Sequence, residues 1–169
     1  MKKQNVYRLI SYLKFLFSAT NQHGVHSPFV YNYVTKCLYR KTKIKLPISL
    51  KILVKSLTYF EYKTLQLLKS DKTSEEKIKK NCPSISIVDS HADVVFGKMS
   101  DLDETEFNVN KLSNDSMLLL DGIHKNRQNL EKWMQLKELK HVRVTIDLFY
   151  CGLVFFRKEQ EKEHFKIRI

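Results

Sequence analysis

Cysteine and glycine are scarce in this chain, and it has no long apolar run without charges. The three cysteines lie far apart, match no Cys-x-x-Cys spacing and are odd in number, which argues against a disulfide framework and a cysteine-based metal site. No stretch of about 18 uncharged apolar residues occurs, so the sequence predicts no membrane-spanning helix. Arg8 and Lys14 interrupt the apolar start, which is atypical of a secretion signal. We therefore expect a protein of the reducing cytoplasm.

The composition predicts a folded chain. Apolar residues make up 43% of the 169 residues, and ten Phe and eight Tyr are among them. Burial of this much apolar surface can offset the conformational entropy that folding costs, so we expect the chain to fold and not to be disordered throughout. A chain of this length is one domain on the usual prior.

Positive charge is concentrated in the first half. Residues 1–80 hold 17 Lys and Arg against 4 Asp and Glu, whereas residues 81–169 hold 13 against 14. Such a field attracts phosphates, anionic lipid or an acidic protein. Tyrosines at 39, 59 and 62 are interleaved with the lysines, as on a nucleic-acid surface, although no base-reading motif accompanies them. The sequence leaves nucleic acid, an anionic membrane and a protein partner open for residues 1–80.

The first third of the chain predicts helices. Apolar residues spaced by three and four form one stripe of a helix over residues 5–18; they are Val6, Leu9, Ile10, Leu13, Leu16 and Phe17. Ser27 and Pro28 are typical of an N-cap and first position of a second helix, and a third is expected over 49–60. Residues 1–62 are thus a basic helical section. We expect the stripe to pack across the sheet or against a second copy in a homo-oligomer; an anionic membrane is the alternative.

Residues 63–169 predict an α/β domain that forms one compact unit with the helices. Four consecutive large apolar residues at 117–120 are typical of a strand covered on both faces, as in parallel sheets. A helix over 126–140 follows, and then a strand pair around Gly152. The expected strands are 64–68, 84–89, 117–120, 142–149 and 153–157, with short apolar or alternating pieces at 93–96 and 165–169, a polar helix at 70–80 and an acidic turn at 101–106.

Two stretches together resemble a known family. The first is His23-Gly24-Val25-His26-Ser27-Pro28-Phe29-Val30, and the second runs from Asp121-Gly122-Ile123-His124 through Val144-Thr145-Ile146-Asp147-Leu148-Phe149 to Gly152-Leu153-Val154-Phe155-Phe156-Arg157-Lys158. The pair is similar to a bacterial family of class I S-adenosylmethionine-dependent methyltransferases. The resemblance covers residues 5–40 and 85–169. It implies a reduced, doubly wound Rossmann-like sheet with antiparallel C-terminal strands, preceded by N-terminal helices, and S-adenosylmethionine at the carboxyl edge of the first strands.

The resemblance also implies four site residues. Ser70 and Asp89 would bind the cofactor, with Asp89 at the end of the second strand accepting hydrogen bonds from the ribose hydroxyls. Asp121 and His124 would lie near the methyl acceptor, where Asp121 could orient His124 as a general base for a hydroxyl. The plainer alternatives are that Asp89 is a solvated strand end, and that Asp121 caps the following helix with His124 in its first turn.

The cofactor half of the chain departs from the family pattern. If residues 63–70 form the first strand, Gln66 stands at the acidic position and Leu68 at a glycine position, where backbone would have to approach the ligand. The stretch up to Met117 is also too short for the usual strand-helix units. The sequence therefore predicts that S-adenosylmethionine is not bound in the ordinary way. Three classes stay open: a methyltransferase acting on a hydroxyl or amine, a non-catalytic remnant that is a basic binding module, and a decayed product without a function of its own.

Two groups of residues have spacings that a metal site could use. His23 and His26 are three residues apart, and Asp89, His91 and Asp93 alternate, which places them on one face of an extended chain. Structural loops with solvated or backbone-bonded side chains are the commoner explanation of both patterns. We therefore predict no metal site.

Overall fold

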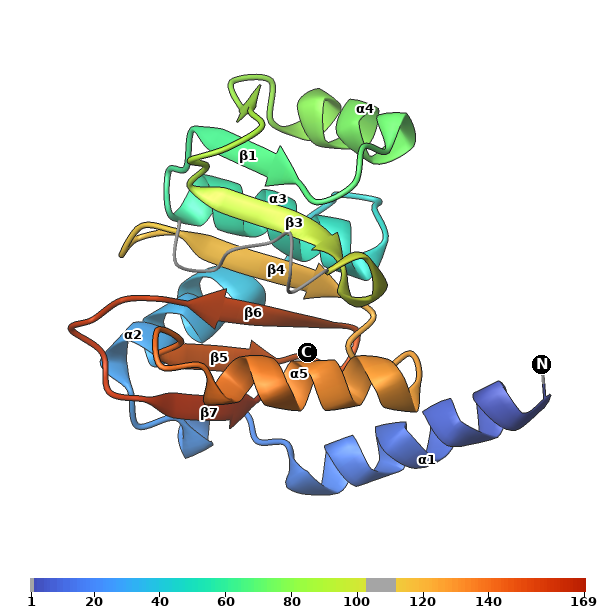
Figure 1. The fold of residues 1–169 in the computed structure, drawn as a ribbon. Helices are drawn as coiled ribbons and strands as arrows, with labels where there is room; N and C mark the ends of the chain where they lie inside the picture. Colours follow the sequence, from blue (N-terminus) through green and yellow to red (C-terminus); the bar gives the residue numbers. More distant parts are fainter. Residues whose placement is uncertain (1, 103–111) are drawn as a thin grey trace.

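One mixed β-sheet organises the protein. The computed structural model describes residues 2–102 and 112–169, so most of the expected acidic turn at 101–106 lies outside the described residues. Within them, seven strands form a sheet in the order β2-β1-β3-β4-β6-β5-β7 (Figure 1). The strands are β1 (Thr64–Leu67), β2 (Ser86–Ile87), β3 (Val94–Lys98), β4 (Met117–Asp121), β5 (Val144–Asp147), β6 (Cys151–Phe155) and β7 (Glu163–Lys166).

Strand β6 runs antiparallel to both of its neighbours, β4 and β5, whereas the other neighbouring pairs are parallel. The predicted α/β class is confirmed, and the mixed sheet is of the Rossmann-like kind. The predicted strand pair around Gly152 is confirmed as β5 and β6. The tail forms β7, which lies parallel beside β5 at the edge of the sheet.

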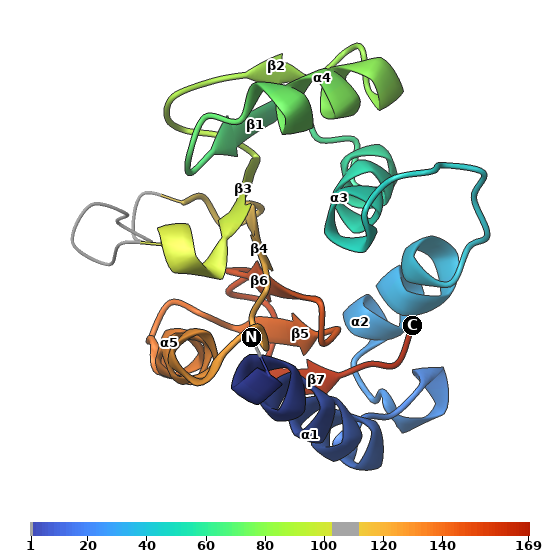
Figure 2. The same ribbon diagram turned by 90° about the vertical axis from the view of Figure 1, so that its right-hand side faces the viewer.

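Helices cover both faces of the sheet. In the described ranges they are α1 (Lys2–Ser18), α2 (Pro28–Tyr33), α3 (Ile48–Tyr59), α4 (Lys72–Asn81) and α5 (Arg127–Glu138), and a π-helical turn at Val34–Leu38 continues α2. Figure 2 shows α2 and α3 on one face and α5 on the other. None of the helices that the structure describes combines the length and apolar character that a bilayer crossing requires.

The helix starts follow from local hydrogen bonding. The Ser27 side chain accepts a hydrogen bond from the Val30 backbone N–H at 3.4 Å and Pro28 is the first residue of α2, which confirms the predicted N-cap. The Asn126 side chain accepts from the Asn129 backbone N–H at 2.7 Å and so caps α5. Each cap satisfies a backbone donor that the helix itself leaves without a partner.

Strand β4 is the centre of the protein, as its sequence predicts. All four residues from Met117 to Leu120 have an exposed fraction of 0%. Met117 and Leu119 pack with the helices α2 and α3, whereas Leu118 and Leu120 pack with Trp133 of α5. Burying one such side chain stabilises the fold by roughly 1.5–3 kcal/mol, so this strand fixes the two helical layers to one sheet.

Helix α1 does not pack as its apolar stripe predicts. Val6, Leu9, Ile10, Leu13 and Phe17 are exposed, Phe17 to 91%. The helix contacts the body through its opposite side, where Phe15 and Ala19 are buried with Phe149, and it extends beyond the sheet toward its N-terminal end (Figure 1). The expectation that the stripe packs across the sheet is therefore wrong, because Phe15 and Ser11 provide the inward face. Packing against a second copy or a membrane stays a prediction.

Candidate functional site

A cleft lies at the carboxyl ends of β1, β3 and β4, where the strand order reverses. From β1 the chain passes through α4 to β2 on one side, whereas β3 lies on the other side of β1. The cleft has a volume of about 460 Å³. Open α/β sheets bind ligands at this kind of switch point, and small-molecule pockets have volumes of about 300–1,000 Å³. We therefore take this edge cleft as the candidate site.

The edge cleft combines both signs of charge. Its lining contains three lysines and three aspartates, together with hydroxyl groups and an apolar part; the charged residues are Lys69, Lys77, Lys98, Asp71, Asp101 and Asp121. Leu50, Leu67 and Phe96 supply apolar surface. Such a lining is suited to a ligand that itself carries positive and negative groups beside an apolar part.

Asp121 ends β4 and lies in the cleft. The Ser49 hydroxyl, from the first turn of α3, donates a short hydrogen bond to Asp121 Oδ1. Its other oxygen, Oδ2, has no protein hydrogen bond in the part of the chain that the structure describes. Burial raises the pKa of the neighbouring Cys151 thiol, and the charge of Asp121 raises it further. The thiol thus stays protonated beside the carboxylate.

Ser70 also lies in the cleft, just before α4. The next residue, Asp71, caps this helix: its Oδ1 accepts from the Thr73 backbone N–H at 3.1 Å and its Oδ2 from the Ser74 hydroxyl at 2.6 Å. The hydrogen bond from Ser74 contributes most to lowering the pKa of Asp71. The positive end of α4 therefore already holds a carboxylate, which disfavours a ligand phosphate at this position.

Asp89 lies outside the cleft lining. Residues 88–93 connect β2 to β3 and are held against β1: Gln66 Nε2 donates to the Asp89 carbonyl oxygen at 2.8 Å, and Asp93 Oδ2 accepts from the backbone N–H groups of Lys63 and Thr64 at 2.7 and 2.8 Å. Although burial raises the pKa of Asp93, these hydrogen bonds lower it on balance. Gln66 and Asp93 thus hold the connection in place.

The alternating acids after β2 do not assemble into a metal site. The Asp93 carboxylate is occupied by backbone donors, and in residues 2–102 and 112–169 no group of three or more His, Cys, Asp or Glu side chains could hold a metal ion. In the first loop, His23 Nε2 contacts the Gln22 side-chain amide at 3.1 Å.

Leu68 does not fill the cleft. Its side chain packs with the cluster on the α5 face, which contains Val95 and Leu118, whereas the neighbouring Leu67 lines the cleft. Gly97 permits this packing, because a Cβ atom there would lie 2.6 Å from the Leu68 Cβ. Successive strand residues point to opposite faces. Leu68 therefore replaces a glycine of the family pattern without blocking the cleft with its side chain.

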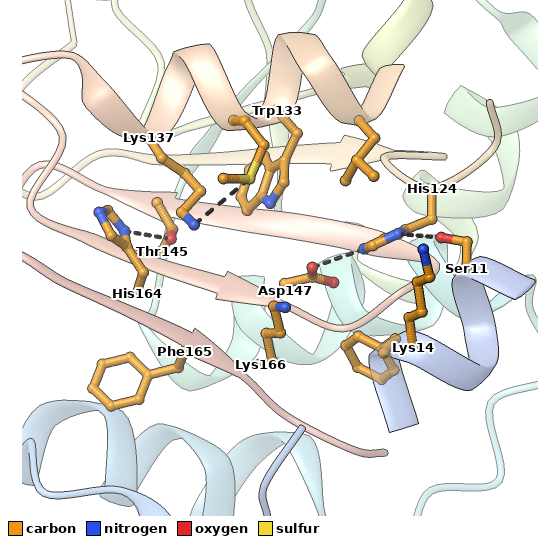
Figure 3. A pocket seen from close by; sticks show the side chains of 13 residues that line it. Ser11, Lys14, His124, Trp133, Lys137, Thr145, Asp147, His164, Phe165 and Lys166 are labelled. Atoms are coloured by element: carbon orange, nitrogen blue, oxygen red, sulfur yellow. Dashed lines mark hydrogen bonds and ion pairs between the residues drawn. The ribbon is translucent and has the colours of Figure 1, made fainter. Parts of the chain in front are cut away.

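His124 is not brought to Asp121 but to Asp147, at the end of β5. His124 Nε2 lies 2.8 Å from Asp147 Oδ2, and Nδ1 lies 2.9 Å from the Ser11 hydroxyl of α1 (Figure 3). A carboxylate only accepts, so Nε2–H donates to Asp147, and in the neutral ring Nδ1 accepts from Ser11. The expected orientation of His124 by Asp121 is therefore wrong. The helix-cap alternative is wrong as well, because Asn126 caps α5.

This trio lies at a second cavity of about 240 Å³, enclosed by α1, α5, β5 and β7 (Figure 3). Ser11, His124 and Asp147 have exposed fractions of 8, 7 and 4%. Asp147 Oδ1 also accepts from the Phe149 backbone N–H at 2.8 Å, and the Phe149 ring stacks on His124 at 4.9 Å. Sequence reasoning missed Ser11 and Asp147, because residues 113 and 23 positions away from His124 share no local spacing with it.

No protein-family model and no curated protein matches this chain. The two cavities are therefore the basis for inferring function. The edge cleft has room for S-adenosylmethionine and holds Ser70 and Asp121, whereas Asp89, the expected ribose ligand, lies outside it. The anchoring pattern that the resemblance implies is therefore only partly present in the edge cleft.

Proposed function

We propose that the protein is a reduced, methyltransferase-like protein that binds S-adenosylmethionine, or its demethylated product, in the edge cleft. The observation that carries the proposal is the cleft itself: it lies at the switch point of the sheet and has lysines and aspartates around an apolar part. S-adenosylmethionine carries a carboxylate, an ammonium and a sulfonium group beside an adenosine. Lys69 and Lys98 could pair with its carboxylate, and Asp101 and Asp121 with its positive groups.

The topology supports the same proposal. The resemblance implies a doubly wound sheet that ends in antiparallel strands, and β6 is inserted antiparallel between β4 and β5. Fold likeness alone does not establish an activity, since unrelated functions share such sheets. The cleft chemistry is therefore the stronger support.

The proposed binding mode differs from the one that the family pattern implies. Gln66 carries an amide, which donates to the backbone carbonyl of Asp89, and Asp89 lies outside the cleft lining. The proposed mode therefore uses neither residue as the acid that binds the ribose. When bound, S-adenosylmethionine supplies an activated methyl group. Of the protein's own residues, Asp121 would face the positive groups of the cofactor through Oδ2, while Ser49 holds Oδ1.

Calorimetric titration tests this proposal with two matched variants. The full chain should bind S-adenosylmethionine and its demethylated product. Asp121→Asn should weaken binding roughly tenfold or more, since a hydrogen bond to a charged group contributes about 1.5–3 kcal/mol. Asp89→Asn makes the same chemical change outside the cleft and should leave the affinity unchanged.

Two outcomes would count against the proposed mode. Absence of heat with both ligands at about millimolar concentration would eliminate S-adenosylmethionine as the ligand. If Asp89→Asn loses binding whereas Asp121→Asn keeps it, the ligand lies at the end of β2 instead. Methyl transfer itself is then measured with radiolabelled cofactor and mixed cellular acceptors, with Asp121→Asn as the matched inactive variant.

A hollow in the basic section favours a second candidate function, that of an RNA-binding module. It has a volume of about 430 Å³, and its lining includes Lys36, Arg40, Lys41 and Lys55 but no carboxylate. Burial lowers the pKa of Lys55, and Tyr59 supplies an aromatic face in the same hollow. Cations beside an aromatic ring suit a nucleic-acid strand.

The RNA-binding candidate is tested by fluorescence anisotropy with single-stranded RNA across a salt series. A variant with Lys36→Gln, Arg40→Gln and Lys41→Gln should bind RNA more weakly. The slope of its log affinity against log salt concentration should fall by the equivalent of roughly two to three phosphate contacts. The matched control removes three exposed positive charges of the second half, at Lys125, Lys140 and Lys158. If the two variants lose equal RNA affinity, the effect comes from net charge and not from the hollow.

A further inference from the structure

The second cavity, under α1, is separate from the edge cleft and combines basic side chains with apolar walls. Its lining includes Lys14 of α1, Lys137 of α5, and His164 and Lys166 of β7 (Figure 3). Its volume of about 240 Å³ limits it to a small ligand. Four basic side chains from three elements converge on it, which no short sequence pattern predicts.

The lysines of this cavity, Lys14, Lys137 and Lys166, form no ion pair with the residues that the structure describes. Lys166 Nζ donates only to the Ser18 hydroxyl at 3.1 Å, and Lys137 Nζ contacts the Met134 sulfur at 3.9 Å. The positive groups of the cavity therefore interact with neutral protein atoms or with solvent.

Asp147 is the acid of the cavity lining, but it is already committed. Its Oδ2 accepts from His124 Nε2 and its Oδ1 from the Phe149 backbone N–H, at 2.8 Å each. Through these two hydrogen bonds, Asp147 fixes His124 and the backbone at Phe149 at the inner end of the cavity. The carboxylate balances part of the charge but does not pair with the lysines.

The pKa shifts of the cavity residues agree with an excess of positive charge. Burial lowers the pKa of Lys137, and the charge of Lys166 lowers it further, which outweighs the opposite effect of Asp147. Burial also lowers the pKa of His164, followed by the charge of Lys137. A bound anion would relieve this repulsion, because an opposite charge nearby favours the charged form of each group.

The rest of the cavity is apolar. Leu130 and Trp133 of α5 and Phe165 of β7 line it together with Phe15 of α1. Trp133 has an exposed fraction of 1%, so its ring is a rigid wall. A ligand that matches this cavity has a compact apolar body and one anionic group that reaches the lysines.

We propose that the cavity under α1 binds a small organic anion: an oxyanion group, carboxylate or phosphate monoester, on a compact apolar body. Lys137 and Lys166 bind the oxyanion, and the wall of Trp133 and Phe165 holds the body. Ser11, His124 and Asp147 are positioning residues that fix α1 over the cavity. This inference does not depend on the edge cleft, because the two sites share no lining residue.

The probes for the test are benzoate and phenyl phosphate, with benzyl alcohol as the neutral analogue and inorganic phosphate as the anion without a body. Binding to the full chain is followed by ligand-detected NMR and calorimetry. We expect benzoate or phenyl phosphate to bind at least about tenfold more tightly than benzyl alcohol and inorganic phosphate. The tighter of the two anions identifies the oxyanion as carboxylate or phosphate.

Variants locate the binding. Lys137→Gln with Lys166→Gln should weaken binding of the preferred anion by about tenfold or more, whereas Lys137→Arg with Lys166→Arg should retain it. Lys80→Gln, on the distant α4, removes one positive charge elsewhere and should change affinity by less than about twofold. Thermal unfolding of each variant confirms that it is folded.

Three results would overturn the proposal: no binding of either anion at about 10 mM, benzyl alcohol binding as tightly as benzoate, or full affinity in the double Gln variant. Because Lys137 and Lys166 lie outside the edge cleft, the same double variant should keep its affinity for S-adenosylmethionine. Failure of the anion site and failure of the proposed function are therefore seen separately.

Discussion

Gly152 of β6 lies directly against the ring of Trp133, and we predict that Gly152→Ala is destabilising for this reason alone. An added Cβ atom would lie 2.5 Å from Trp133 Cη2, 2.6 Å from Cζ3 and 3.0 Å from Cζ2. Ordinary van der Waals contact begins at 3.4 Å. Trp133 is buried between α5 and the sheet with an exposed fraction of 1%, so the ring has little space into which to move.

The magnitude follows from overpacking. Forcing one extra methyl group into a packed interior costs about 1–3 kcal/mol in the free energy of unfolding. Trp133→Leu alone should cost about 3 kcal/mol or more, because it leaves a cavity in the core. In that background the same Gly152→Ala change should be neutral or stabilise by up to about 1 kcal/mol, since alanine lowers the entropy of the unfolded chain. The two changes should therefore couple by about 1–3 kcal/mol.

Urea unfolding measures this double-mutant cycle. The signal must be far-ultraviolet circular dichroism, because Trp133 is the single tryptophan of the chain and its fluorescence disappears in two of the four proteins. Gly122→Ala is the matched control. Gly122 has φ +75° with no neighbouring atom closer than 3.6 Å to an added Cβ, so its cost of about 1 kcal/mol should be the same with and without Trp133. An equal cost of Gly152→Ala in both backgrounds would refute the close-contact argument.

Three further predictions concern individual side chains. Ser11→Ala removes the buried hydrogen bond to His124. We expect the free energy of unfolding to fall by about 1–2 kcal/mol and trypsin to cleave α1 faster. An unchanged cleavage rate would contradict the role of this hydrogen bond in holding α1 against the body of the protein. The pKa of Asp93 is lowered from 3.8, so its contribution to stability is full above that pH and lost below it; the stability difference between wild type and Asp93→Asn should shrink as the pH falls below about 4 in acid unfolding. Cys82 is half-buried whereas the other two cysteines are buried; a disulfide-exchange reagent should label it first, and rapid native labelling of all three would be inconsistent with the structure.

The spacing of apolar residues predicted those elements whose pattern depends only on nearby residues in the sequence. The run at 117–120 indicates a strand covered on both faces, and β4 is one. The turn residues around Gly152 indicate the antiparallel pair, and β5 and β6 form it. These predictions hold because side-chain alternation and turn chemistry depend on neighbours within a few residues.

Periodicity failed where several faces of one element are apolar. Helix α1 carries the expected stripe, yet the buried Phe15 and Ser11 lie opposite to it. Contacts of Phe15 and Tyr12 with Phe149, together with the hydrogen bond from Ser11 to His124, fix the orientation of the helix. None of these contacts is visible as a repeat in the sequence. The stripe alone therefore states which surface is apolar, not which surface faces the sheet.

Two of the four expected site residues, Ser70 and Asp121, lie together in the edge cleft, whereas Asp89 and His124 do not. The ends of β1 and β4 identify Ser70 and Asp121, because carboxyl ends of parallel strands share one edge. The partners of these side chains come from distant segments: Ser49 for Asp121, and Ser11 with Asp147 for His124. Such pairings depend on how helices dock, which one sequence does not determine.

The amide at Gln66, where the resemblance implies an acid, and the short connection between β2 and β3 are structurally linked. A parallel crossover ordinarily needs about a dozen residues and a helix, whereas residues 88–93 join β2 to β3 with no helix between them. The connection is stable because Asp93 accepts two backbone N–H groups of β1 and Gln66 donates to the Asp89 carbonyl. Gln66 can do so because its side chain is an amide, since a carboxylate offers no donor. Gln66, which stands where the resemblance implies an acid, is thus the residue that secures the short connection between β2 and β3. The charged side chains of the edge cleft come instead from β3, β4, α4 and the segments that follow β1 and β3.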